Sequence, residues 1–303
     1  MKIILEQLLN GLTIGSFYAL IALGYSMVYG VMKLINFAHG DLFALGSYLG
    51  FTLLVWGNSY ITAHFGVVFG MIAAMLIAAI GVGISGLMVE RIAYRPIYPA
   101  GRLPAVVSAL GVSIFLENAL MVIWGPKPQV YPSEAILSVV LNIGAIKITL
   151  LQIIILIISF LLMGSLYYLI QKTTFGAAIR ASALDRETAA LMGININMII
   201  FFIFALGPAL GGVAGVMVGM YYRKINFILG WNYGLKAFTA TILGGIGNIP
   251  GAMVGGLLLG IFEMLGSSYI STAYKDIFVF LILILVLIFR PRGLLGEKVA
   301  EKV

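Results

Sequence analysis

Polar side chains that could do chemistry are few in this sequence, and the densest group separates two apolar runs that are long enough to cross a bilayer. Asn36, His39 and Asp41 stand together in that short turn. Charged side chains at membrane depth are costly and usually face a cavity or a partner, so these residues are predicted to line a path or its gate. The alternative is a solvated turn in which Asp41 caps the following helix.

Two further acidic residues lie in other apolar runs. Glu117 stands in the middle of the run 104–124, where it is predicted either to line the path or to be a structural hydrogen-bond partner. Glu263 lies near the end of its segment, where contact with solvent is the simpler interpretation.

Several other kinds of chemistry are excluded by residue type. The sequence has no cysteine and only two histidines, His39 and His64, which lie in separate segments, so we expect neither a disulfide nor a metal site. It has no G-x-x-x-x-G-K-[ST] motif, and any energy from ATP must therefore come through another polypeptide. No carboxylate pair or Ser/His/Asp cluster suggests hydrolysis. We expect no catalytic residue, no enzyme activity and no cofactor bound by this chain.

The composition indicates what kind of elements hold these residues. Of the 303 residues, 62% are hydrophobic and 10% are charged, and the mean hydropathy is +1.11. A soluble domain is about half apolar and a quarter charged, so this chain is predicted to be embedded in membrane lipid. A soluble enzyme and a nucleic-acid binder are excluded. The net charge of +7 is interpreted first as basic residues retained in cytoplasmic loops.

Apolar runs predict the membrane-spanning helices, since about 20 apolar residues cross a bilayer. Seven are clear: 8–31, 37–56, 65–89, 104–124, 148–170, 194–221 and 277–289. An eighth stretch, 235–266, is broken in its middle by a segment that contains Gly247, Asn248 and Pro250. Either two short crossings or a re-entrant hairpin fits this stretch. We expect an all-α polytopic membrane protein with seven to nine transmembrane helices, in a single domain over residues 1–303.

The distribution of Lys and Arg predicts the orientation of the chain in the membrane. With the N-terminus outside, eleven of the eighteen basic residues fall inside. They are Lys33, Arg91, Arg95, Arg102, Lys172, Arg180, Arg186, Arg290, Arg292, Lys298 and Lys302. Cytoplasmic loops are enriched in such residues, so an outside N-terminus and an inside C-terminus are favoured. That arrangement needs an odd number of crossings, either seven plus a hairpin or nine.

Glycines recur at every fourth position in two of these segments. One series is Gly207, Gly211, Gly215 and Gly219, and the other is Gly247, Gly251 and Gly255. Small residues at this spacing let helix backbones approach closely in a membrane. Tight packing is the simpler interpretation, and helices that slide against each other during transport are the alternative.

The loop 173–193 is predicted to be a cytoplasmic docking element. Residues 177–192 are rich in Ala and other helix formers, and Gly193 is placed to end the helix. A short amphipathic helix of this kind either docks in a groove on a partner or lies on the membrane surface.

At this loop and at three other stretches the sequence resembles the branched-chain amino acid permease family of bacterial ABC importers. The family's cytoplasmic motif is E-A-A, three residues, then G; here Glu187, Thr188 and Ala189 are followed by Gly193, with Thr in place of the first Ala. The other matching stretches are 36–40, 90–96, and 236–240 leading into 244–252. Together they extend over almost the whole chain.

The resemblance implies a multi-pass permease of the bacterial cytoplasmic membrane that works with a second, homologous permease, two cytoplasmic ATPase subunits and an extracytoplasmic substrate-binding protein. ATP-driven closure of the ATPases would switch the permease pair between outward and inward openings, for leucine, isoleucine and valine. The resemblance assigns the coupling surface to Arg180, Asp185, Glu187, Ala189 and Gly193. It also assigns the turn 36–41 and the break around Gly247, Asn248 and Pro250 to internal discontinuous elements.

Three other functions stay open from the sequence. Related permeases carry urea, short amides or other amino acids, and the cargo is not encoded in any motif. An ion-coupled secondary transporter would use Glu117 and the broken segment, although it would not need the Ala-rich loop. A membrane enzyme would need a convergent polar cluster, which the sequence lacks.

Overall fold

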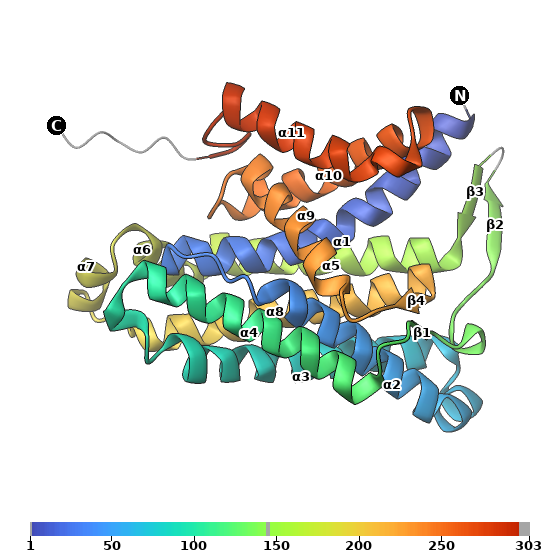
Figure 1. The fold of residues 1–303 in the computed structure, drawn as a ribbon, viewed down its shortest axis with the longest axis horizontal. Helices are drawn as coiled ribbons and strands as arrows, with labels where there is room; N and C mark the ends of the chain where they lie inside the picture. Colours follow the sequence, from blue (N-terminus) through green and yellow to red (C-terminus); the bar gives the residue numbers. More distant parts are fainter. Residues whose placement is uncertain (1, 144–145, 297–303) are drawn as a thin grey trace.

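The protein is a bundle of long helices, described in a computed structural model for residues 2–143 and 146–296. The helices are α1 (Lys2–Met32), α2 (His39–Phe65), α3 (Val67–Val89), α4 (Arg102–Trp124), α5 (Leu150–Lys172), α6 (Thr174–Leu184), α7 (Arg186–Leu191), α8 (Ile196–Tyr222), α9 (Leu229–Gly244), α10 (Ile249–Tyr269) and α11 (Lys275–Phe289). Short helical turns lie at Glu90–Tyr94, Tyr98–Ala100, Ser133–Ala135 and Thr272–Tyr274. Figure 1 shows the long helices side by side, with the short α6 and α7 at one end.

Within the described ranges, eight helices are long and apolar enough to cross a membrane. They are α1, α2, α3, α4, α5, α8, α10 and α11, which confirms the all-α polytopic fold. The broken stretch 235–266 forms α9, which has only 16 residues, followed by the longer α10. It is therefore a short helix and a full-length one joined by a turn.

The two ends of the described chain lie at opposite ends of the bundle (Figure 1). Near the start of α1, the carboxylate of Glu6 accepts a hydrogen bond from the backbone N–H of Lys147 (3.1 Å). Near the other end, the N–H of Leu294 bonds the carbonyl of Leu243 (2.8 Å), beside the α9–α10 turn. Lys298 and Lys302, which were assigned to the inside, lie outside the described residues.

Two short antiparallel strand pairs complete the end opposite α6 and α7. β1 (Gln129–Val130) pairs with β4 (Lys224–Ile225), and β2 (Val140–Ile143) pairs with β3 (Ile146–Thr149) as a hairpin. The hairpin leads into α5 through a capping box, in which the Thr149 side chain accepts from the N–H of Gln152 (3.2 Å). The apolar runs gave no sign of these strands, because they lie in the polar connections.

The glycine series allows α8 to lie at the centre of the bundle. Gly207 lies against Gly24 of α1, and Gly215 lies against the backbone of Phe43 in α2, where an added Cβ would overlap its neighbours. The second series does the same between α9 and α10, since Gly251 lies against Gly244. The prediction of close helix packing is confirmed at both places.

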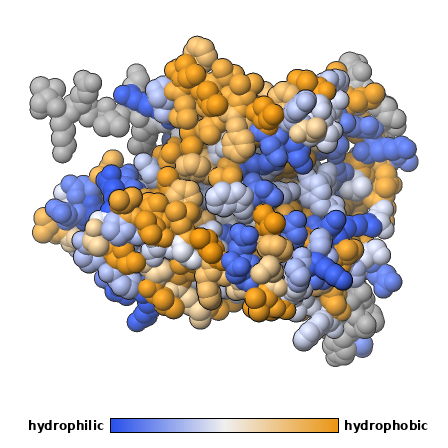
Figure 2. Space-filling model, viewed as in Figure 1, coloured by the Kyte–Doolittle hydropathy of each residue, from blue (hydrophilic) through white to orange (hydrophobic). Residues whose placement is uncertain are grey.

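The outer helices present apolar side chains on the surface. α4 and α11 are the most exposed of the candidate spans, and Ile277, Ile284 and Ile288 of α11 all face outward. Figure 2 shows apolar surface over α10 and α11, and hydrophilic residues both at the α6–α7 end and over the half of this face toward the strands. This distribution suits lipid around the middle and water at the ends.

Candidate functional site

The chain turns back into the bundle after α1. Lys33 has a left-handed backbone (φ 54°), and the following residues return to the side of α1, where α2 begins at His39. The His39 side chain is fully buried, and its Nε2 lies 3.1 Å from the carbonyl oxygen of Ile21. Asn36 is also buried, and its Oδ1 accepts a hydrogen bond from the hydroxyl of Tyr94 (2.8 Å). The interpretation as a solvated turn is therefore wrong.

Asp41 lies in the first turn of α2, inside the bundle. Its side chain is 1% exposed, and one carboxylate oxygen accepts a hydrogen bond from the hydroxyl of Ser113 in α4. The other oxygen, Oδ1, has no hydrogen-bond partner among the described residues. Because α2 begins at His39, Asp41 is the third residue of the helix, and the expectation that it is the N-cap is incorrect.

Glu117 lies on the same helix as Ser113, one turn further on. Residues four apart share one face of a helix, so Glu117 is on the side of α4 that meets Asp41. Its side chain is half-buried. This arrangement puts the Glu117 carboxylate on the face of α4 that contacts Asp41. In the sequence, Glu117 stands in the middle of the same apolar run.

The start of α9 packs against the first turn of α2. α9 begins at Leu229, and Gly230 lies so close to the Asp41 side chain that an added Cβ would overlap Oδ1. One turn later, Gly234 lies against the backbone of Gly40. The glycines are needed here for close approach, and they bring the start of α9 onto the first turn of α2.

The turn after α9 lies elsewhere. Gly247 (φ 88°) lies against Gly30 near the end of α1, and the Oδ1 of Asn248 caps α10 by accepting from the N–H of Gly251 (2.8 Å). Pro250 is in the first turn of α10. The structure thus brings Asn36, His39 and Asp41 together and places Gly247, Asn248 and Pro250 at the other end of α9, about 24 Å along its axis.

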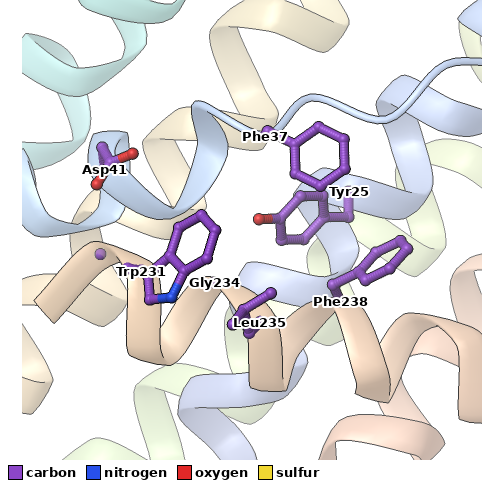
Figure 3. A pocket seen from close by; sticks show the side chains of 8 residues that line it. Tyr25, Phe37, Asp41, Trp231, Gly234, Leu235 and Phe238 are labelled. Carbon is purple, nitrogen blue, oxygen red and sulfur yellow. The ribbon is translucent and has the colours of Figure 1, made fainter. Parts of the chain in front are cut away.

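A small pocket lies where the two segments meet (Figure 3). It is lined by Tyr25 of α1, Phe37 before α2, Asp41 of α2, and Gly230, Trp231, Gly234, Leu235 and Phe238 of α9. The ring centroids of Tyr25 and Phe238 are 6.0 Å apart, and those of Phe37 and Phe238 are 6.4 Å apart. The cavity volume is about 10 Å³, which is room for about one water molecule. Tyr25, Trp231 and Phe238 were not predicted as site residues, although Phe238 lies within the broken stretch 235–266 and Trp231 shortly before it.

A buried ion pair lies on the other side of α9. The Nζ of Lys236 is 2.6 Å from Oε1 of Glu263 in α10 and 2.7 Å from Oδ1 of Asp276 in α11. The hydroxyl of Tyr18 donates to the second oxygen of Glu263 (2.7 Å). Glu263 is only 6% exposed, so its interpretation as a solvated residue is wrong. Its cation is 27 residues away, and no sequence pattern indicates the pair.

The loop 173–193 forms two helices, α6 and α7, instead of the single one expected over 177–192. Asp185 separates them, because its side chain accepts hydrogen bonds from the backbone N–H groups of Glu187 (2.9 Å) and Thr188 (3.1 Å) and so caps α7. Gly193 ends the element with φ 86°, as expected.

The surface of this element is apolar at its tip. Leu184, Leu191 and Met192 are 83%, 88% and 80% exposed. Of the residues assigned to coupling, Arg180 and Glu187 are exposed, and Ala189 is buried against the rest of the loop. Exposed apolar side chains beside charged ones are typical of a docking helix.

A groove connects this loop to the segment that leads to Asp41. Its volume is about 420 Å³, and it lies between residues 182–187, the end of α1 with Lys33, and Tyr98 to Arg102. The Nε of Arg186 donates to the carbonyl of Val31 (2.6 Å). Burial lowers the pKa of the Arg186 guanidinium, which the Tyr98 hydroxyl opposes. The loop 173–193 is thereby bonded to the end of α1, just before the chain turns back toward the pocket.

The sequence model of the family described as "Branched-chain amino acid transport system / permease component" matches residues 7–287. The chain is 45% identical to the high-affinity branched-chain amino acid transport system permease protein LivH of Salmonella typhimurium, over 99% of this chain and 97% of the relative. It is 44% identical to LivH of Escherichia coli over the same shares. It is 45% identical to BraD of Pseudomonas aeruginosa, over 99% of this chain and 98% of that protein.

Proposed function

Since this chain belongs to the family of permease components of branched-chain amino acid transport systems, we propose that it forms part of the membrane path for leucine, isoleucine and valine in an ATP-driven importer. The chain itself is not an enzyme and binds no cofactor; partner subunits bind and hydrolyse ATP.

The pocket between the first turn of α2 and the start of α9 is the observation that carries this proposal. It joins a buried carboxylate to apolar and aromatic walls where the start of α9 meets the discontinuous segment before α2. Transporter sites are commonly built in this way, because interrupted helices offer backbone and side-chain polar groups at membrane depth. A zwitterion with an aliphatic side chain matches both parts of the lining.

The partners follow from the surface at the other end of the groove. We assign α6 and α7, with Arg180, Asp185, Glu187, Ala189 and Gly193, to docking on a cytoplasmic ATPase subunit. The exposed Leu184, Leu191 and Met192 provide its apolar contact. The complete importer would contain a second, homologous permease, two ATPase subunits and an extracytoplasmic binding protein.

This assignment sets the orientation in the bacterial cytoplasmic membrane. Lys33, Arg102 and Arg186 line the groove beside α7, so the basic residues gather at that end. By the positive-inside rule we place that end, with residue 296, in the cytoplasm and the start of α1 outside, so that the short α9 is the ninth crossing beside the eight long helices.

Uptake by the purified complex in proteoliposomes tests the function. The complex, with ATP enclosed, is given the binding protein and either labelled leucine or labelled urea. We expect ATP-dependent accumulation of leucine and none of urea. Uptake of urea alone would show that urea is the cargo in place of leucine. Leucine uptake that needs an ion gradient and no ATP would show that the protein is a secondary transporter and not part of an importer.

A further inference from the structure

The free carboxylate oxygen of Asp41 lacks a cation in the described structure. Ser113 supplies one hydrogen bond to Oδ2, and Oδ1 has no partner. Glu117, which lies on α4 one turn beyond Ser113, adds negative charge to the same region. Lys236 is held by Glu263 and Asp276, and so it does not neutralise Asp41. A carboxylate buried in this way must either bind a proton or be paired with a cation, and an ammonium ligand would supply that cation.

The walls around this oxygen suit an ammonium group with an apolar chain. Trp231 and Tyr25 line the pocket with Asp41, and in the view of Figure 3 the Trp231 ring is seen between Asp41 and the cluster of Tyr25, Phe37 and Phe238. Aromatic faces attract cations within about 6 Å, and this attraction is strongest where water is excluded. Leu235 adds an aliphatic wall.

We propose that Asp41 is the counterion of the α-ammonium group of the transported amino acid, and that the aromatic walls hold the same group and the start of its aliphatic side chain. The inference rests on the proposed function, because it gives that function its polar contact. The cavity now holds about one water molecule, so α9 must move away from α2 to admit a ligand. The contact between Gly40 and Gly230, which have no side chains to interlock, is where these two elements can separate.

The variants separate charge from shape. Asp41→Asn keeps the size and the acceptor for Ser113 but removes the charge, whereas Asp41→Glu keeps the charge. Gly230→Ala places a methyl group against Oδ1 and fills the pocket without changing any charge. Glu134→Gln removes an exposed carboxylate in the turn Ser133–Ala135, which does not line the pocket, and is the matched control.

Trp231 provides a direct readout of the pocket. The fluorescence of the assembled complex is compared with that of the same complex carrying Trp231→Phe, and the difference is titrated with three compounds. Leucine and 3-methylbutylamine contain the ammonium group, and 4-methylpentanoate has only the carboxylate. We expect the first two to change the difference signal saturably and the third to leave it unchanged. Asp41→Asn should weaken the response to both amines by about tenfold or more, the effect of losing a charge-assisted hydrogen bond. Asp41→Glu should retain more of the response than Asp41→Asn, and Gly230→Ala should abolish it.

Leucine uptake by the same preparations separates the two proposals. Equal responses to 4-methylpentanoate and 3-methylbutylamine would overturn the ammonium site, and so would an Asp41→Asn complex that titrates like the parent. A complex that imports leucine with ATP but shows no Trp231 response to either amine would also overturn it and leave the proposed function standing. A parent complex that hydrolyses ATP but does not import leucine would overturn the proposed function itself.

Discussion

Among the described residues, two carboxylates are buried within the spans, and their surroundings differ. Glu263 has a cation, Lys236, and a hydroxyl donor, Tyr18, each within 2.7 Å. Asp41 has one hydroxyl donor and a second oxygen without a partner in the described ranges. Both charges cost free energy to bury, but only the first is compensated by the protein itself. The paired acid, Glu263, therefore holds the helices around it together, whereas the unpaired oxygen of Asp41 can still bind a ligand.

The largest effect is expected where the compensated charge loses its cation. Lys236→Met leaves Glu263 buried without a positive partner, because the change removes the only basic group bonded to it in the described structure. We expect the free energy of unfolding in detergent to fall by about 3–5 kcal/mol. Denaturant titration followed by circular dichroism measures it. The double variant Lys236→Met/Glu263→Met should regain most of the loss, and a single variant as stable as the parent would remove the distinction between the two acids.

Removing the charge of the uncompensated acid, Asp41, should leave the stability nearly unchanged and lower the transport of leucine. Asp41→Asn removes a buried charge and keeps the acceptor for Ser113, so the free energy of unfolding should stay within about 1 kcal/mol of the parent or rise. Leucine uptake at saturating binding protein should nevertheless fall by about tenfold or more. Parallel unfolding and uptake measurements check both parts. A large loss of stability would mean that Asp41, like Glu263, is structural.

The loop 173–193 lies outside both acidic sites, and changes in it should affect the proposed coupling to ATP hydrolysis. Glu187→Lys reverses an exposed charge, and Gly193→Val places a branched residue at φ 86°, where only glycine is unstrained. We expect both to lower the leucine imported per ATP hydrolysed while the spans stay folded. Normal coupling in both variants would show that α6 and α7 are not the contact with the ATPase.

The smallest effect is expected at the α9–α10 turn. Asn248→Ala removes the N-cap of α10 and should lower the free energy of unfolding by about 1 kcal/mol. Because this turn lies about 24 Å along α9 from the start of the pocket, the Trp231 response should be unchanged. A loss of that response would extend the path to Asn248, as the sequence first suggested.

The spanning helices were predictable because each is a long apolar run. The break at 244–251 was visible in the same way, since Gly and Pro interrupt a helix whatever surrounds them. The split between α6 and α7 was not, because Asp185 stands among helix formers and its preference for a cap prevails only in the folded loop.

The site was predictable only in part. Asn36, His39 and Asp41 were identified from their polarity, but their burial depends on the chain turning back along α1, a tertiary contact between His39 and Ile21. Tyr18 and Glu263 are 245 residues apart, and Lys236 and Glu263 lie on different helices. The pairing of charges therefore depends on helix packing, which no local pattern encodes. For the same reason the aromatic residues of the pocket were missed.

The most direct test of the central claim is the number of leucine molecules imported per ATP hydrolysed by the complex in proteoliposomes, for the parent and for Asp41→Asn. We expect ATP-driven import by the parent, whereas the variant should be folded, hydrolyse ATP and import little leucine. Equal ratios for the two proteins would contradict the claim that this carboxylate receives the cargo.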